Sequence, residues 1–455
     1  MNDFLSYALA FAVLLGVLII VHEFGHFLVA RMCGVKVLRF SIGFGRPLCS
    51  IQAGADRTEW ALGAFPLGGY VKMLDEREGE VSPAELHRAF NRQTVLRRIA
   101  IVSAGPLANF LLAIVLYWGV FGAGSEELRP VFGPPVAASP AALAGIEDGE
   151  RVIKAGDEDV QTWQELRWVL IKRAVAQDEI VLEVINPRHE IAHRRLNLAM
   201  ARSNGWEGDA IEKLGLTLHR PSIAPVIGMV AASSPAENAG LRSGDLVLAI
   251  DGRQITAWHE VVQAVREAPG RRLDFMLSRA GEMLHLAVVP AVREEGGREF
   301  GRIGAGARDG AEIRQQMMVV VRYGALEALQ RALAETWDKT VFSVEMMGRM
   351  LVGEVSWKNV SGPVSIADYA GQSARLGLDY YLKFMALVSV SLGVLNLLPV
   401  PILDGGHLLY YVAEIIKGRP LSERSMEVGQ KIGLALMLLL MACAFYNDIN
   451  RLLSG

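Results

Sequence analysis

Residues 12–30 read AVLLGVLIIVHEFGHFLVA, an apolar run with one polar cluster inside it. The cluster is an HExxH sequence, in which His22 and His26 are four positions apart and Glu23 follows the first histidine. On an α-helix, residues four apart are separated by about 40° around the axis and about 6 Å along it, so both imidazoles can reach one ion. Burying such groups in a membrane span is costly unless they are paired or coordinated. We therefore expect a zinc site with two histidine ligands and Glu23 as general base; uncoordinated polar residues on a helix surface are the alternative.

The composition indicates a membrane protein that also carries a polar domain. Hydrophobic residues make up 51% of the 455 residues and charged residues only 21%, which is too apolar for a simple soluble enzyme. The net charge of -3 and the lack of a long basic run argue against nucleic-acid binding. Cys33, Cys49 and Cys443 are too few and too scattered for a disulfide framework, and none lies in a CxxC pair.

Four stretches reach the roughly 18 to 20 apolar residues that a bilayer crossing requires. They lie at about residues 5–30, 99–121, 380–400 and 430–447. We interpret the first as a retained span and not a signal peptide, because no basic segment precedes it. The loop between the first two spans is rich in arginine and lysine, which predicts a cytoplasmic position. Residues 122–379 then lie outside, residues 401–428 are cytoplasmic, and both termini face outward.

A catalytic zinc site normally has three protein ligands, so the histidine pair needs a partner. Asp404 is the candidate, because it follows the third span and the predicted topology brings it to the membrane face where the first span ends. Pro399 and Pro401 interrupt the helix before it, and broken backbone at membrane depth is tolerated only where protein shields it or it lines a wet cavity. An ordinary turn at residues 404–406 is the alternative. We interpret His407 as a neighbour of the site and not as a ligand.

The predicted outer region contains an internal repeat. Ser139-Pro140-Ala141 recurs as Ser234-Pro235-Ala236, and Gly149 recurs as Gly244, each 95 positions later. Each copy predicts a short helix, a strand, a turn and a second helix. The pattern resembles tandem PDZ domains of the circularly permuted bacterial kind; duplicated α+β domains without a ligand-binding groove are the alternative. Leu214-Gly215-Leu216, ahead of the second copy, is a candidate carboxylate-binding loop.

After the repeat, residues 324–352 carry apolar residues at three-to-four spacing with charged residues between them. This spacing predicts an amphipathic helix on the outer face of the membrane. A helix packed on the repeated domains is the alternative.

HExxH and the LDG motif at 403–405 are together signatures of the site-2 proteases, and the chain resembles this family of M50 zinc metalloproteases along nearly its whole length. Residues 43–45, 66–73 and 105–109 also resemble family segments. The resemblance implies that 66–73 belongs to a membrane-associated β region that receives unwound substrate as an added strand. A structural hairpin is the alternative. The residues of this region that we expect to contact substrate are Gly68, Gly69 and Tyr70.

The resemblance also implies a role for Asn396, eight residues before the LDG aspartate. Its amide is expected to hold the substrate backbone, or else only to satisfy the interrupted helix. The segment at 105–109 is expected to lie near the active site, with a bent entry into the second span as the alternative.

The activity implied by the resemblance is zinc-dependent cleavage of a single-span membrane protein such as an anti-sigma factor. Cleavage would follow a first cut on the outer side by a site-1 protease, within an envelope stress response, and could extend to remnant signal peptides. The implied location is the bacterial inner membrane, with the PDZ pair in the periplasm and the active site near the cytoplasmic face. The PDZ pair would act as a size filter or read the new C-terminus. A non-catalytic PDZ scaffold in the membrane is the alternative function.

The predicted fold class is a multi-pass α-helical membrane protein with four transmembrane helices, a membrane-associated β region and tandem circularly permuted PDZ domains. Five parts are expected along the chain: a membrane core at 1–121, PDZ domains at 122–220 and 221–308, a helical linker at 309–379, and a second membrane core at 380–455.

Overall fold

The computed structural model describes residues 3–206, 209–295, 298–308, 310–419 and 421–454. The chain divides into two compact units, and each is described by itself. The first unit comprises Met1–Ser125, Ser203–Glu207 and Val321–Gly455, and the second comprises Glu126–Arg202 and Gly208–Val320. The first unit therefore joins the two ends of the chain, each of which carries one of the predicted metal-binding motifs.

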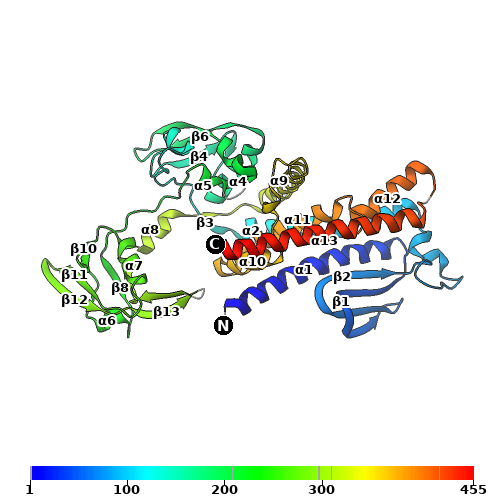
Figure 1. The fold of residues 1–455 in the computed structure, drawn as a ribbon, viewed down its shortest axis with the longest axis horizontal. Helices are drawn as coiled ribbons and strands as arrows, with labels where there is room; N and C mark the ends of the chain where they lie inside the picture. Colours follow the sequence, from blue (N-terminus) through cyan, green and yellow to red (C-terminus); the bar gives the residue numbers. More distant parts are fainter. Residues whose placement is uncertain (1–2, 207–208, 296–297, 309, 420, 455) are drawn as a thin grey trace. The chain divides into compact units, whose positions relative to one another are not determined.

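The first unit is mainly helical and carries one long β-hairpin (Figure 1). Its elements are α1 (Asp3–Met32), β1 (Val37–Ala53), β2 (Thr58–Met73), η1 (Leu86–Arg88), η2 (Phe90–Arg92), α2 (Val95–Ala123), α9 (Ala325–Leu351), η4 (Trp357–Asn359), α10 (Pro363–Leu376), α11 (Leu378–Leu397), α12 (Asp404–Lys417) and α13 (Glu423–Ser454).

Four helices of the described chain are long and apolar enough to cross a membrane, and they coincide with the four predicted stretches. They span Leu5–Met32, Val95–Ala123, Leu378–Leu397 and Arg424–Arg451. The third ends before the predicted residue 400, because Leu398 precedes Pro399 and takes extended backbone. The second runs through Pro106 without a break, and Thr94 caps its start by accepting from the amide of Arg97.

Two apolar clusters hold these helices together. Leu14 and Leu18 of α1 are fully buried against α10 and α11, where Met385 belongs to the same cluster. Ala113 of α2 is buried in a second cluster with Val390 of α11 and with α9. The packing of α1, α2 and α11 against one another fixes where the ends of α1 and α11 lie, and these ends carry the predicted site.

Helix α9 is the predicted amphipathic helix, and it packs on α2 and α11. Its buried face is made of small residues, Ala328, Ala332 and Thr336. The other face exposes large apolar side chains, among them Trp337 with 68% of its surface exposed. An unburied apolar stripe of this kind is typical of a helix in contact with lipid.

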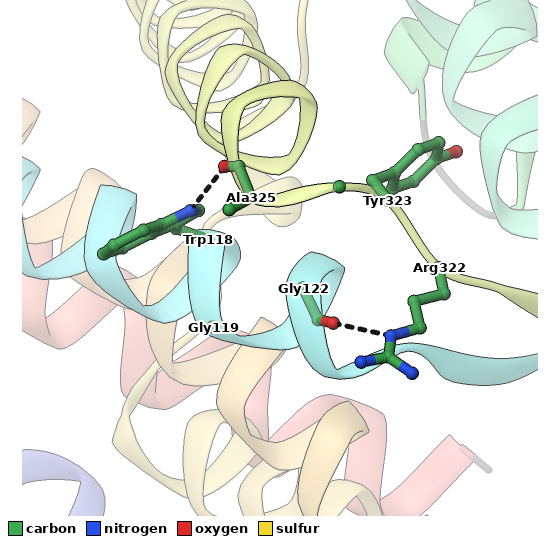
Figure 2. Close-up of a pocket in the computed structure, with 7 residues that line it drawn as sticks. Trp118, Gly119, Gly122, Arg322, Tyr323 and Ala325 are labelled. Atoms are coloured by element: carbon green, nitrogen blue, oxygen red, sulfur yellow. Dashed lines mark hydrogen bonds between the residues drawn. The ribbon is translucent and has the colours of Figure 1, made fainter.

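Two side-chain hydrogen bonds connect the C-terminal end of α2 to the start of α9 (Figure 2). The indole nitrogen of Trp118 donates to the carbonyl of Ala325 at 2.9 Å. The guanidinium of Arg322 donates from Nε to the carbonyl of Gly122 at 3.1 Å. These residues line an open hollow of about 610 Å³ at this junction.

Helix α13 is attached near its C-terminal end by a carboxylate. Asp448 is only 2% exposed and caps the start of α10 by accepting from the amides of Gly362, Val364 and Ser365 at 3.0, 2.9 and 3.2 Å. The Ser365 hydroxyl also donates to it. A carboxylate at a helix N-terminus satisfies amides that lack partners within the helix, so this cap joins α13 to the rest of the unit.

The β-hairpin folds its two long strands into four short antiparallel segments. Residues 37–42 pair on one side with 69–73, residues 39–42 pair on the other side with 59–62, and 58–63 pair in turn with 47–53. The hairpin was expected as part of a β region, but its double pairing was not predicted. Segment 69–73 has a paired neighbour on only one side in this sheet, which leaves it as an edge strand.

The second unit contains the same order of elements twice. The first copy comprises α3 (Pro140–Leu143), β4 (Arg151–Ala155), β5 (Glu158–Asp159), α4 (Trp163–Ala176), β6 (Glu179–Ile185) and β7 (Ile191–Asn197). The second comprises α6 (Pro235–Asn238), β9 (Leu246–Ile250), β10 (Arg253–Gln254), α7 (Trp258–Arg266), β11 (Leu273–Arg279) and β12 (Glu282–Val288). Their sheets have equivalent strand orders, β5-β4-β6-β7 and β10-β9-β11-β12.

Shorter elements connect the two copies to each other and to the first unit. They are β3 (Ser125–Leu128), η3 (Ala199–Trp206), α5 (Ala210–Lys213), β8 (Ile227–Val230), β13 (Ala291–Glu295), β14 (Arg298–Arg302), β15 (Ala305–Ala307), α8 (Gly310–Met317) and β16 (Met318–Val321).

The amides of residues 214–216 each donate to a carbonyl of the α5 turn. They are not available to bind a carboxylate, so the prediction for Leu214-Gly215-Leu216 is wrong.

Each copy buries one ion pair at the same place. Glu150 in the first copy is fully buried and pairs with Arg194. Asp245, its counterpart in the second copy, is fully buried and accepts from Arg279 at 2.7 and 2.8 Å. Each acid also accepts from an amide three residues before it. The pair thus closes the turn that precedes the first long strand of each sheet.

Candidate metal centre

Three of the predicted site residues meet in the first unit. The Nε2 atom of His22 lies 3.2 Å from Nε2 of His26 and 3.2 Å from Oδ2 of Asp404. His26 Nε2 lies 3.4 Å from the same carboxylate oxygen. These three side chains form a group whose ligand atoms could hold one metal ion. Helix α1 supplies both histidines, and the first residue of α12 supplies the carboxylate.

The spacing of these atoms fits zinc. Ligand atoms at about 2.0–2.2 Å from a tetrahedral zinc ion lie roughly 3.3–3.6 Å from one another. The separations of 3.2, 3.2 and 3.4 Å are close to this range. Two imidazoles and one carboxylate are also a donor set found in catalytic zinc sites, which leave one position open.

The surroundings of Asp404 favour the ionised form of its carboxyl group. Burial would raise its pKa, but the neighbouring imidazoles of His22 and His26 outweigh burial and hold the pKa of Asp404 below its ordinary value. An ionised carboxylate is the form that binds a metal.

The backbone ahead of Asp404 explains the glycines that follow it. Pro399 ends α11, and the chain folds back tightly before α12 begins. A Cβ atom on Gly405 would lie 2.2 Å from the Leu398 carbonyl oxygen, and one on Gly406 would lie 2.3 Å from the Val400 oxygen. Only glycine fits at both positions, so the LDG motif is a steric requirement for placing the carboxylate.

His26 is held in a single orientation from both sides. Its Nδ1 lies 2.8 Å from the carbonyl oxygen of Ile101, so Nδ1 carries the hydrogen and Nε2 is left with a lone pair for the metal. On the other side, a Cβ atom on Gly105 would lie 2.2 Å from His26 Nε2. Gly25 of α1 meets α2 equally closely, because its Cβ would lie 2.4 Å from the Ala104 oxygen. The segment at 105–109 therefore lies at the site, as expected.

Glu23 lies beside the hairpin. A Cβ atom on Gly69 would be 2.9 Å from Glu23 Cγ and 2.8 Å from the Ser41 oxygen. Gly69, the first residue of the edge segment 69–73, thus lies against the expected general base. Gly68 faces the ring of Phe44 instead of the metal ligands. Tyr70 is also turned away from them: its hydroxyl accepts from Arg39 at 3.1 Å and its ring stacks on Phe44.

Asn396 is half-buried in the last turn of α11. The interrupted backbone after it is satisfied by its own groups, because the Leu398 amide donates to the Leu395 carbonyl and the Leu403 amide donates to the Val400 carbonyl. The described residues supply no recorded hydrogen bond for the Asn396 amide. His407 lies outside the metal-ligand group and contacts Tyr410.

Sequence reasoning missed two contacts of functional interest, one made by Asn109 within the segment expected near the site and one made by Arg98. Asn109 is fully buried in the middle of α2, and its Nδ2 lies 3.1 Å from His22 Nδ1. A polar residue inside an apolar span was the signal that could have identified it. Arg98 of α2 pairs with Glu414 of α12 at 2.7 Å and lies over the ring of Tyr411. Burial raises the pKa of Tyr411 to about 12, so its ring stays neutral at this contact.

Comparison with known proteins agrees with this geometry. The chain matches peptidase family M50 over residues 10–440. It is 41% identical over 457 residues to the regulator of sigma-E protease RseP of Escherichia coli, covering 99% of this chain and 100% of that protein. It is 42% identical, over 98% of this chain and 99% of the relative, to a Neisseria meningitidis protein provisionally named a zinc metalloprotease. Protease RseP of Yersinia pestis is 40% identical over 97% of this chain and 98% of that protein. The chain therefore belongs to peptidase family M50, and it is a zinc metalloprotease of the site-2 type.

Proposed function

We propose that His22, His26 and Asp404 hold the catalytic zinc ion and that Glu23 is the general base for cleavage of a membrane-spanning protein. The observation that carries this proposal is the meeting of three ligand atoms at 3.2 to 3.4 Å, which come from two helices far apart in the sequence. A protein that served only as a PDZ scaffold would have no need for this arrangement, or for a carboxylate one residue after the first histidine.

When bound, zinc would polarise the scissile carbonyl and lower the pKa of an attacking water. Glu23 extends from the same helix turn as His22, so its carboxylate is positioned to accept a proton from the attacking water and return it to the leaving amine. Asp404 and the Ile101 carbonyl keep the imidazoles oriented, so the residues do not have to reorganise during the reaction.

The edge strand 69–73 is the proposed docking site for substrate. A transmembrane helix protects its peptide bonds with internal hydrogen bonds, and adding it to a sheet edge as a strand would expose them. Gly69 supports this role because its backbone lies against Glu23, so a strand paired beside it would run past the general base. Gly68 and Tyr70 would act through the shape of this edge. The Asn396 amide, which is not needed by its own helix, would hold the substrate backbone.

The likeness to RseP supports a substrate of the anti-sigma type within an envelope stress response. In this proposal a site-1 protease first shortens the substrate on the outer side, and the duplicated domains, which we interpret as a PDZ pair in the periplasm, admit only the shortened form. Clearance of remnant signal peptides would use the same site. The protein would reside in the bacterial inner membrane, with Asp404 near the cytoplasmic face.

The test compares Glu23→Gln with Asp404→Ala in protein purified in detergent, using a single-span substrate whose outer domain has been removed. Glu23→Gln is expected to keep zinc and to lose cleavage by about 10²- to 10⁴-fold, as for loss of a general base. Asp404→Ala is expected to lose both. Glu80→Gln, at an exposed acid in the loop after the β-hairpin, is the matched control and is expected to keep both. Full cleavage by Glu23→Gln would overturn the assignment.

A further inference from the structure

Asn109 combines three features that its apolar surroundings do not explain. Its side chain is fully buried in the middle of α2. Its Nδ2 atom lies 3.1 Å from Nδ1 of His22, the ring nitrogen that points away from the metal-ligand group. Its Oδ1 atom is buried and has no hydrogen-bond partner among the described residues. Leaving a buried amide oxygen unpaired costs about 1–3 kcal/mol, so the position needs a reason.

The reason lies in the tautomer of His22. A histidine that binds a metal through Nε2 must carry its hydrogen on Nδ1, and Nδ1 then needs an acceptor. For His26 the acceptor is the Ile101 carbonyl, which can only accept a hydrogen bond and never donate one. His22 instead faces an amide, which has an acceptor on one side and a donor on the other.

The two orientations of that amide suit two states of the site. With Nδ2 towards His22, as in the structure, Nδ1 accepts and the hydrogen is on Nε2, which lies 3.2 Å from Asp404 Oδ2. With Oδ1 towards His22, Nδ1 carries the hydrogen and Nε2 is free to bind metal. Rotation of the amide by half a turn exchanges the two arrangements without moving either helix.

We propose that Asn109 is a positioning residue that fixes the ring and the tautomer of His22 and turns its amide when zinc enters or leaves. The inference rests on the proposed zinc site. It assigns to Asn109 no contact with substrate, and it makes His22 the adjustable ligand and His26 the fixed one.

A neighbouring contact provides a matched control. The hydroxyl of Ser389, which is fully buried in α11, donates to the backbone carbonyl of Asn109 at 2.7 Å. Ser389→Ala removes a buried hydrogen bond at the same residue without touching the amide. If Asn109 affected only the packing of α2, Ser389→Ala and a substitution of Asn109 would therefore lower zinc affinity alike.

The experiment measures the zinc dissociation constant by chelator competition in detergent, and thermal unfolding with zinc removed by chelator. Asn109→Leu, which has a similar volume and no hydrogen bond, is expected to raise the dissociation constant about 10- to 100-fold. Asn109→Asp is expected to retain zinc, because a carboxylate accepts from Nδ1–H. Ser389→Ala is expected to bind zinc as the unmodified protein does. In the presence of chelator, Asn109→Leu is expected to unfold at no lower temperature than Ser389→Ala.

Unchanged zinc affinity in Asn109→Leu would overturn the inference, and so would equal losses in Asn109→Leu and Ser389→Ala. Loss of zinc in Asn109→Asp as severe as in Asn109→Leu would also overturn it. His22→Ala separates the two proposals. If His22→Ala binds zinc normally, the proposed metal site itself is wrong. If His22→Ala loses zinc while Asn109→Leu binds zinc normally, only the role of Asn109 is removed.

Discussion

Gly105 leaves no space between α2 and the ring of His26. A methyl group built on its α-carbon would lie 2.2 Å from Nε2, the atom that faces the metal-ligand group, and 2.6 Å from Cε1. Separations this short cannot be accommodated without moving the ring. The closeness of the two helices is therefore part of how the ligand geometry is set.

Gly105→Ala is expected to displace His26 and weaken zinc binding by at least about tenfold, in the range found when metal-ligand orientation is lost. Zinc content after equilibrium dialysis measures the effect. Gly119→Ala, also in α2 but with no atom within 4 Å of a new Cβ, is the matched control and is expected to keep zinc. Normal zinc binding by Gly105→Ala would show that the close approach is not required.

Gly69→Ala tests the contact between the edge strand and the general base. The added methyl would lie 2.8 Å from the Ser41 carbonyl oxygen and 2.9 Å from Glu23 Cγ, so the strand and Glu23 must move apart, and we expect the cleavage rate to fall roughly 10- to 100-fold, as for small displacements of catalytic groups. Zinc content is expected to stay normal, because the ligands themselves are not touched. Gly79→Ala, which meets no atom within 4 Å, is the control. A loss of zinc in Gly69→Ala would contradict the separate roles of strand and ligands.

The local parts of the site could be predicted from the sequence, because helix geometry alone places residues four apart on one face. The meeting of His22 and His26 follows from that rule, and the approach of Asp404 follows from counting spans and ligands, whereas the role of Glu23 stays a prediction. Pro399 also marked the end of α11 correctly to within a few residues. These inferences need only short-range periodicity and the thickness of a bilayer.

The features that could not be predicted depend on register between distant segments. Strand β1 pairs twice with β2, and no alternation pattern in a single strand specifies two partners. The turn of Tyr70 away from the metal ligands follows from that register, because its ring stacks on Phe44 and its hydroxyl bonds to Arg39. The contact between Asn109 and His22 likewise needs the rotation of α2 about its own axis, which hydrophobic periodicity leaves loosely defined.

The buried pair of Asp245 and Arg279 predicts acid sensitivity in the second copy of the repeat. Burial alone would raise the pKa of Asp245, but hydrogen bonds from Arg279 and from the Arg242 amide outweigh it and lower that pKa. A carboxyl whose pKa is lower in the folded state stabilises the fold above its unfolded pKa of about 3.9. That contribution is lost as the pH falls from this value through the lower folded pKa.

Asp245→Asn should therefore destabilise the second copy at neutral pH, and the difference from the unmodified protein should shrink below about pH 4. Amide hydrogen exchange in β9 and β11 of the full chain, measured at several pH values, reports this difference locally. The first copy, with Glu150 and Arg194 intact, is the internal control. A difference that stays constant down to pH 3 would rule out titration of Asp245 as its source.

Arg98 and Glu414 provide the sharpest test of how Asp404 is positioned, because they join α2 to the same helix that begins with that ligand. Their side chains are 12% and 13% exposed and 2.7 Å apart, and the Arg98 guanidinium lies over the Tyr411 ring. Breaking a buried pair by replacing one partner costs about 3–5 kcal/mol, because the other charge is left unpaired. We expect Arg98→Glu or Glu414→Arg alone to lower both the unfolding temperature and the zinc affinity, since α12 would no longer be held against α2. The double exchange should recover much of both losses. A double-mutant cycle on zinc affinity measures the coupling directly, and strictly additive losses would show that this pair contributes to folding without positioning the metal ligand.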